Sequence, residues 1–318
     1  MQLRPIRYFV TAMAVVLGSL ALFFTSCKSG NKSTNEHLSL RVGAMSSMDY
    51  LPYVIAEKIG VYDSLGLDLE IVKFFSANDR DAAFRAGQVD GTITDFTSAA
   101  IQHAAGLPLA IVVKHDGYFE MMANAAFTSM EELRGKKFAV ARNTVIDYST
   151  DLMLEAAGMA ESDVEKPEVN KIPLRLEMML ADEVDASVFP DPFITIARAK
   201  GFTSLSSTKE LDISVVGTVM RRPVLEENAE AVKLLLIGYN MGVDYILSRS
   251  LEDLKEVLVE DAGIPEALAS QVVLPAYQHA VLPREKDMRA TIKWLHEKEL
   301  IPADYDGEGL VDGSFILE

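Results

Sequence analysis

The chain has 318 residues, too many for one small core and enough for two ordinary lobes. Its 47 acidic and 30 basic side chains give a formal net charge of −17, which argues against a nucleic-acid-binding protein because such a protein needs a basic face. The single cysteine excludes a disulfide framework, an iron–sulfur cluster and a cysteine-based zinc site, and the 49% apolar content excludes a disordered chain.

The N-terminus has the pattern of a secretory signal peptide. Arg4 and Arg7 precede an uncharged run of 17 residues, which is short for a membrane span, and small residues follow. The sequence FTSC that ends at Cys27 resembles the lipobox of bacterial lipoproteins, and this resemblance implies that Cys27 is acylated after cleavage. We therefore predict a signal peptide over 1–26 and a lipidated tether over 27–37. An uncleaved N-terminal anchor is the alternative.

Beyond the tether, short apolar runs alternate with helical patterns, which predicts βαβ units and mostly parallel sheets. In the first half the predicted strands are 40–43, 67–75, 89–94 and 109–114, and the predicted helices are 53–61, 79–86 and 98–105. In the second half the predicted strands are 137–141, 169–172, 184–188 and 214–220, and the predicted helices are 148–157 and 174–180. The last third is predicted to be helical over 227–247, 265–273 and 285–298.

Two motifs recur at an offset of 95 residues. Val-Asp-Gly at 89–91 recurs as Val-Asp-Ala at 184–186, and Gly106, which ends a predicted helix, recurs as Gly201. Because both matches have the same offset and the same order of elements, they predict two lobes of one design.

Ligands of open α/β sheets bind at the carboxyl ends of strands, and three predicted strands here lead into helix starts rich in hydroxyl and amide groups. A helix N-terminus offers unpaired N–H groups and partial positive charge, so several of them together could hold an oxyanion. The same residue types are also ordinary N-caps, which is the alternative at each junction. The candidates are Ser46 and Ser47 at the first junction, Asp95, Phe96 and Thr97 at the second, and Arg142, Asn143 and Thr144 at the third.

Two carboxylates complicate the interpretation as a site for a bare anion. Asp95 and Asp191 would repel nitrate or sulfate, and they would suit an amine, an amidine-like pyrimidine or a zwitterion such as taurine. Flat aromatic side chains could supply walls for a ring, or they could belong to the core instead. These aromatic candidates are Tyr50, Phe75, Phe96 and Phe189.

The sequence contains no motif of a known catalytic centre. It has no phosphate loop, dinucleotide-binding glycine signature or GxSxG elbow, and no histidine pair has the i, i+4 spacing of a zinc helix. Of the five histidines, only His115 is predicted near the edge of a cleft, where a lone histidine is compatible with a binding or a structural role. We therefore expect no enzyme activity, no cofactor and no metal.

Several stretches of the body carry a family resemblance. They are IGVY at 59–62 with GLDL at 66–69, AGQVD at 86–90, LRGKK at 133–137, VDA at 184–186 with Asp191-Pro192, and LVDGSF at 310–315. In this order they resemble periplasmic substrate-binding proteins of ABC importers, in the branch that serves nitrate, sulfonates, taurine and thiamine-pyrimidine precursors. The resemblance implies an α/β fold of the two-lobed periplasmic-binding-protein type (type II), with a mostly parallel sheet in each lobe.

The resemblance also implies an organisation and a function. We expect lobe 1 at 38–124 and 218–318, lobe 2 at 125–217, and two hinge crossings between them. The lobes would close over one small organic or anionic solute and deliver it to an ABC permease and its ATPase. The protein would act as a monomer outside the cytoplasm, held at the membrane by the lipid on Cys27.

Two other functions stay open. One is an enzyme of pyrimidine-precursor synthesis that shares this fold, although that enzyme carries a cysteine-rich motif and this chain has no cysteine after Cys27. The other is a ligand-sensing lipoprotein that works without a transporter.

Overall fold

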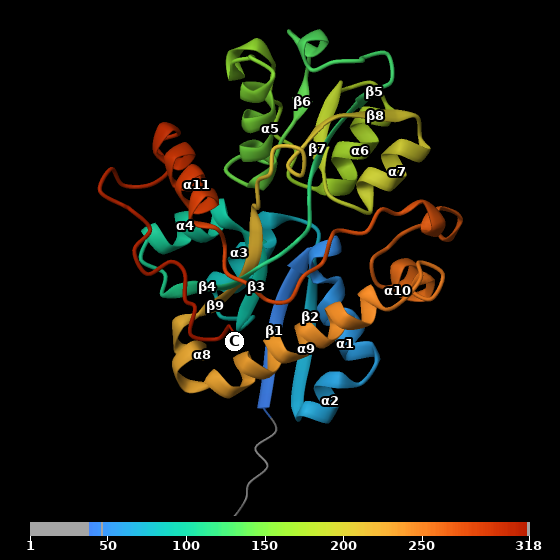
Figure 1. Cartoon of the computed structure of the whole chain (residues 1–318). Helices are drawn as coiled ribbons and strands as arrows, with labels where there is room; N and C mark the ends of the chain where they lie inside the picture. The colour runs from blue at the N-terminus through green and yellow to red at the C-terminus, as the bar shows by residue number, and fades with distance from the viewer. Residues whose placement is uncertain (1–37, 46, 317–318) are drawn as a thin grey trace, which may run out of the picture. The chain divides into compact units, whose positions relative to one another are not determined.

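A computed structural model of the chain describes residues 38–45 and 47–316 (Figure 1). The predicted signal peptide, Cys27 with its predicted acylation, the tether and Ser46 lie outside the described residues. Within those two ranges, no helix combines the length and the apolar character needed to cross a membrane.

Five strands of the described ranges form the first sheet, in the order β2-β1-β3-β9-β4. β1 pairs in parallel with β2 and β3, whereas β9 runs antiparallel between β3 and β4. The strands are β1 (Leu38–Met45), β2 (Leu67–Phe74), β3 (Gly91–Asp95), β4 (Leu109–Lys114) and β9 (Val216–Arg221).

Four further strands of this part of the chain form the second sheet, in the order β6-β7-β5-β8. β6 and β7 are parallel, and β5 runs antiparallel between β7 and β8. The strands are β5 (Glu120–Asn124), β6 (Phe138–Ala139), β7 (Ala186–Phe189) and β8 (Phe202–Ser207). In each sheet all strands but one run in the same direction, which confirms the prediction of mostly parallel sheets. The exceptions are β9 and β5, the strands through which the chain enters each sheet from the other one.

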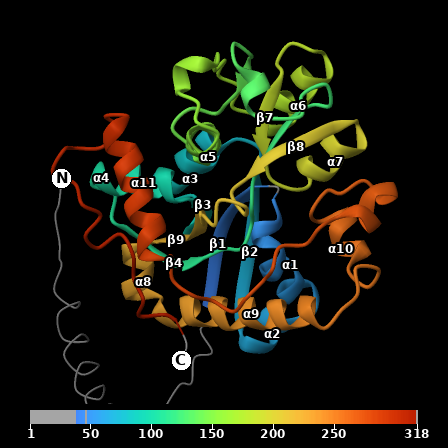
Figure 2. The ribbon, with the colours of Figure 1, turned by 45° about the horizontal axis from the view of Figure 1, so that its top comes forward.

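Helices pack against both sheets. α3, α4 and α9 contact the first sheet, and α5, α6 and α7 contact the second (Figures 1 and 2). The helices are α1 (Leu51–Lys58), α2 (Val61–Leu65), α3 (Ala77–Arg85), α4 (Phe96–Ala104), α5 (Val145–Ala156), α6 (Ile172–Leu180), α7 (Phe193–Ala199), α8 (Arg222–Glu227), α9 (Ala229–Leu247), α10 (Lys255–Glu260) and α11 (Glu285–Glu297). Short 3-10 helices lie at Met48–Tyr50, Glu131–Leu133, Glu161–Asp163 and Glu266–Gln271.

The chain passes between the two sheets over 115–119 and 208–215. We call residues 38–114 with 216–316 lobe 1, and residues 120–207 lobe 2. The sequence predicts the crossings near Asn124 and Thr218, and the observed changes of sheet come a few residues earlier. The first crossing comes earlier than predicted because β5 cannot be recognised as a strand from its sequence. It reads EMMAN and lacks the β-branched residues typical of strands, yet it pairs with β7 and β8. That the lobes move as two bodies stays a prediction.

The internal repeat predicted from the sequence is present as a repeated contact. The backbone N–H of Arg41 donates to Asp90 Oδ2 over 2.8 Å, and the N–H of Lys137 donates to Asp185 Oδ2 over 2.9 Å. In return, the N–H groups of Asp90 and Asp185 donate to the carbonyls of Arg41 and Lys137, both over 2.8 Å. Asp90 therefore links β3 to the parallel strand β1 in lobe 1. Asp185 links β7 to the parallel strand β6 in lobe 2 through the same pair of hydrogen bonds.

The second repeated motif is a glycine that ends a helix. Gly106 follows α4 with a φ of 88°, and Gly201 follows α7 with a φ of 93°. This left-handed conformation favours glycine at the end of a helix. Both parts of the predicted repeat are thus confirmed.

The C-terminal helix α11 belongs to lobe 1 and also contacts lobe 2. It packs on α4 of lobe 1 (Figure 1). Trp294 in α11 donates from Nε1 to Asp151 Oδ2 of α5 over 2.9 Å, and its ring lies 5.2 Å from that of Tyr148. Just before α11, Arg284 pairs with Asp212 of the second crossing at 2.7 Å. The edge of the two lobes beside α11 is therefore closed by side chains from both.

Helix α9 packs closely against α1 because it carries glycine at the contact. A Cβ atom added at Gly242 would lie 2.0 Å from the carbonyl oxygen of Pro52. We expect Gly242→Ala to lower the free energy of unfolding by about 1–3 kcal/mol, because the helices must separate even though alanine is the better helix former. Urea denaturation measures this loss.

The matched control for this prediction lies beside it on the same helix. Met241 is 42% exposed, so Met241→Ala should change the free energy of unfolding by no more than about 0.5 kcal/mol. Equal losses in Gly242→Ala and Met241→Ala would contradict the close contact of α9 with the backbone of Pro52.

Candidate functional site

A cavity lies between the two sheets and is lined by residues of both lobes. Lobe 1 contributes the carboxyl ends of β1 and β3 and the start of α3, and lobe 2 contributes the start of α5, part of α6 and Pro190 after β7. Its empty space is ≈ 540 Å³ with the opening to solvent included. The cavity thus lies where the rule for open α/β sheets predicts a ligand.

On the lobe 1 side, Asp95 ends β3 and caps α4. Its Oδ1 accepts hydrogen bonds from Ser98 N over 2.7 Å and from the Thr97 hydroxyl, and its Oδ2 accepts from Arg80 Nη2 over 3.3 Å. Arg80 also pairs with Asp81 at 2.8 Å. Burial opposes the charge on Arg80, but the carboxylates of Asp81 and Asp95 outweigh it and raise the pKa of the guanidinium. The carboxylate of Asp95 is therefore engaged by protein groups.

Asp49 is a second buried carboxylate of this wall. It is 4% exposed, and Ser47 Oγ donates to its Oδ2 over 2.7 Å. Burial raises the pKa of Asp49 to about 6, and the hydrogen bond from Ser47 opposes the shift. Gly117 of the first crossing lies so close that a Cβ there would come within 1.5 Å of Asp49 Oδ1. The carboxylate is therefore packed against the first crossing.

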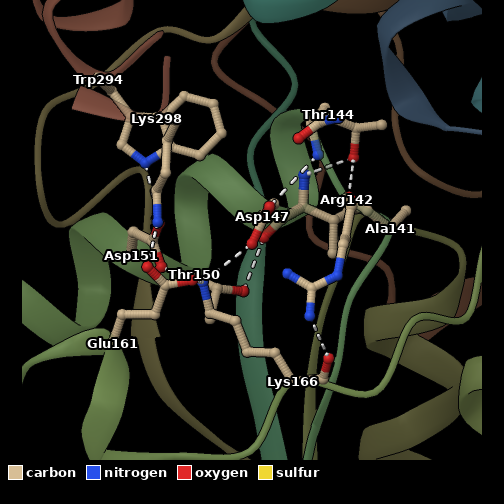
Figure 3. Close-up of polar contacts among 12 residues, drawn as sticks. Ala141, Arg142, Thr144, Asp147, Thr150, Asp151, Glu161, Lys166, Trp294 and Lys298 are labelled. Atoms are coloured by element: carbon tan, nitrogen blue, oxygen red, sulfur yellow. Dashed lines mark hydrogen bonds and ion pairs between the residues drawn. The ribbon is translucent and has the colours of Figure 1, made fainter. Parts of the chain in front are cut away.

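On the lobe 2 side, Thr144 caps α5 at the cavity wall. Its hydroxyl donates to Ala141 O over 2.7 Å and accepts from Ile146 N over 3.2 Å. Arg142 is exposed and donates to the carbonyl of Lys166 over 3.0 Å (Figure 3), and it is not part of the cavity wall. Asn143 is also exposed and has a φ of 62°. Of the three residues predicted at this junction, only Thr144 lines the cavity.

Arg142 lies beside an acidic cluster of Asp147, Asp151 and Glu161 (Figure 3). Lys166 Nζ lies among these carboxylates, 2.9 Å from both Asp147 Oδ1 and Glu161 Oε1, and Lys298 Nζ lies 2.9 Å from Asp151 Oδ2. The ammonium groups of Lys166 and Lys298 therefore lie where a metal ion held by these three carboxylates would lie. We therefore interpret the cluster as an ion-pair network that links α5 to the residue after α11.

Arg175 of α6 is the cavity-lining cation of lobe 2. The residue is 1% exposed, its Nη1 donates to Val169 O over 3.2 Å, and its guanidinium lies 5.5 Å from the ring centroid of Phe189. Among the described residues, no hydrogen-bond partner reaches its Nε or Nη2, and no ion pair includes it. Burial lowers the pKa of Arg175 to about 9 with no carboxylate to oppose the shift.

The aromatic residues predicted as walls lie elsewhere in the described structure. Tyr50 is buried in the core of lobe 1, where its hydroxyl donates to Asp261 O, and Phe96, the first residue of α4, is also buried in the core. Phe75 is 60% exposed at the surface. Phe189 is buried next to Arg175. None of these four residues is part of the cavity wall, and for Tyr50, Phe96 and Phe189 the alternative, a place in the core, holds.

The remaining predicted residues are Ser47, Thr97, His115 and Asp191. Ser47 lines the cavity, whereas Thr97 is turned onto Asp95. His115 is buried, with Nε2 2.7 Å from Thr218 Oγ1, and lines a second groove together with residues of both crossings. Asp191, next to the wall residue Pro190, is 3% exposed and accepts from Thr195 N over 2.8 Å, and burial raises its pKa.

The comparisons with curated sequences point to one kind of protein. The model of the NMT1/THI5-like family matches residues 47–252. Proteins of Brucella abortus (strain 2308) and Brucella suis biovar 1 (strain 1330), provisionally named as binding proteins, are each 26% identical over 198 residues, or 60% of this chain. The chain spans 61% of the length of these relatives.

Solved structures share the fold at low sequence identity. The alkanesulfonate-binding protein SsuA from Xanthomonas axonopodis pv. citri, bound to MOPS, has a TM-score of 0.75 at 17% identity, over 87% of this chain and 98% of that one. The nitrate-binding protein NrtA from Synechocystis PCC 6803 has a TM-score of 0.72 at 14% identity, over 87% of this chain and 86% of that one. The predicted periplasmic-binding-protein fold is therefore confirmed.

Proposed function

The chain belongs to the NMT1/THI5-like family, and from this premise we propose that it is the solute-binding component of an ABC importer. The membership confirms the resemblance to the sulfonate- and nitrate-binding type. The protein would work outside the cytoplasm as a monomer, anchored by the predicted lipid on Cys27, and would hand its solute to a permease with an ATPase. The observation that carries the proposal is a cavity at the strand ends with buried charged groups from both lobes.

Closure of the lobes over the solute is the proposed mechanism. The cavity walls come from both lobes, and the backbone of Ser76 in lobe 1 forms a bridge with that of Lys171 in lobe 2. A solute that touches both walls makes more contacts in the closed arrangement than in an open one, so it shifts the population towards the closed form. The two crossings at 115–119 and 208–215 would absorb the motion.

The proposed solute is a small organic or anionic molecule. Relatives of this fold carry names that specify sulfonates and nitrate, and the cavity combines hydroxyl groups with two buried arginines. Ser47, Asp49, Thr144 and Arg175 are the side chains that we propose for ligand contact. A sulfonate, taurine, nitrate and a thiamine-pyrimidine precursor are the candidate classes.

The same residues give little support to catalysis. His115, the one histidine predicted near the cleft, is not part of the cavity wall and is held by Thr218 instead. The sequence has no cysteine after Cys27 that could form the cysteine-rich motif of the related pyrimidine-forming enzyme. These observations favour binding without turnover.

The test of this function is a solute screen combined with a measurement of size. We expect one of the four candidate classes to raise the melting temperature, with about 2.7 kcal/mol of added stability at 100 times its Kd. Small-angle X-ray scattering of the same mixture should show a smaller radius of gyration. Ala77→Phe, which fills the wall from the half-buried start of α3, is the control and should abolish both responses. Turnover of the solute by the protein alone would contradict the proposal.

A further inference from the structure

Arg175 differs from the other buried cations of the described chain in having no carboxylate partner. Arg80 pairs with Asp81 and Asp95, Lys114 with Asp116, and Lys166 with three carboxylates. Arg175 makes one hydrogen bond to a backbone carbonyl and lies against the Phe189 ring. An unpaired buried charge destabilises a protein strongly, so its presence in a cavity wall indicates a partner that arrives from outside.

We propose that Arg175 binds the acidic group of the solute, a sulfonate, carboxylate or phosphate ester. This inference rests on the proposed function and narrows it to organic acids. The planar guanidinium suits these groups because it can donate two parallel hydrogen bonds to two of their oxygens, and its Nε and Nη2 are the atoms left without partners. The Phe189 ring holds the guanidinium from one side and leaves those atoms free for the solute.

The start of α5 supports an anion at the same wall. Thr144, Val145 and Ile146 line the cavity at the N-terminus of this 12-residue helix, where the helix dipole favours negative charge. This helix end alone would not make a site, and its position beside the unpaired Arg175 gives the wall of lobe 2 a positive character.

The wall of lobe 1 has the opposite character. Asp49 and Asp95 both line the cavity there, and the charge of Arg80 is already balanced by Asp81 and Asp95. A solute with an acidic group would therefore point that group towards lobe 2. Its uncharged or N–H-bearing end would face Asp49.

The test compares each acid with a partner molecule that lacks the acid group. The pairs are 1-butanesulfonate with 1-butanol, taurine with ethanolamine, and the phosphate ester of 4-amino-5-hydroxymethyl-2-methylpyrimidine with its free alcohol. Calorimetry on the wild type and on Arg175→Gln should show that the variant binds the acid on the order of 10- to 100-fold more weakly. Arg175→Lys should recover part of the affinity because it keeps the charge without the planar fork.

A second readout separates a ligand role from a structural one. If Arg175 awaits a ligand, Arg175→Gln removes an unpaired charge, and the melting temperature of the ligand-free variant should equal or exceed that of the wild type. Arg134→Gln, which removes an exposed arginine of lobe 2, is the control for net charge and should leave the affinity unchanged.

The outcomes are distinct. Equal affinity of wild type and Arg175→Gln for the acid overturns the inference, and so does a lower melting temperature with equal losses for both members of a pair. Binding of the partner molecules without the acids overturns the inference and leaves the proposed function intact. A wild-type protein that binds none of the six molecules but binds nitrate overturns the inference and leaves the proposed function intact. A wild-type protein that binds neither the six molecules nor nitrate contradicts both.

Discussion

Arg80→Met should lower the free energy of unfolding by about 3–5 kcal/mol, the largest loss that we expect from a single substitution. Arg80 is 4% exposed and pairs with Asp81 and Asp95 in the wall of the cavity. Without the guanidinium, two carboxylates stay buried side by side with no cation to compensate. Urea denaturation at pH 7.5 measures the loss.

Two further variants show whether charge compensation is the cause. Arg85→Met removes an exposed arginine from the same helix α3 and should change the free energy of unfolding by no more than about 0.5 kcal/mol. Adding Asp81→Asn to Arg80→Met should restore part of the stability, because one buried charge is then gone. A double variant that is less stable than Arg80→Met would show that packing, and not charge, dominates at this position.

Asp49→Asn should have the opposite effect and stabilise the ligand-free protein at neutral pH. Burial raises the pKa of Asp49 to about 6, against 3.8 for an ordinary aspartate. Below pH 3.8 this carboxyl is neutral in both the folded and the unfolded chain, and above pH 6 it is charged in both. Folding then carries the full cost of the buried charge, up to about 3 kcal/mol at 1.36 kcal/mol per pKa unit. Asparagine has no such cost.

The expected signature is therefore a pH dependence. The gain from Asp49→Asn in chemical denaturation should be full at pH 7.5, shrink as the pH falls through 6, and vanish near pH 3.8. His115 lowers stability in acid, because burial lowers its pKa to about 3 and the unfolded chain takes up its proton first, but it does so in both proteins and cancels from the difference. Asp63→Asn, at an exposed position of α2, is the control. A gain that persists unchanged at pH 4 would contradict the buried charge.

Those parts of the site that depend on local chain geometry could be predicted from the sequence. A strand that ends in a capping residue fixes the edge of the sheet and the start of the next helix. Asp95 follows this rule, since it ends β3 and caps α4. Thr144 caps α5 after a short loop that follows β6, and Ser47 precedes a 3-10 helix that its side chain does not cap. All three residues line the cavity. Whether any of them touches a solute stays a prediction.

The parts that depend on how helices face the cavity could not be predicted. The sequence predicts a helix over 174–180 but not which of its side chains face the cavity, and in the structure Leu174 is 44% exposed whereas Arg175 is 1% exposed. The cause is tertiary, since this face of α6 meets the cavity and Phe189. Phe96 is a second example, because it starts α4 on the side that packs into the core.

The contacts of α11 have a consequence for the route by which a solute enters. Beside α11, separating the lobes would break the hydrogen bond of Trp294 to Asp151 and the ion pair of Lys298. At Ser76 and Lys171, it would break an isolated backbone bridge. The contacts at the second edge are fewer and should break first. We therefore expect the lobes to rotate about the edge beside α11, so that a solute enters between the starts of α3 and α6.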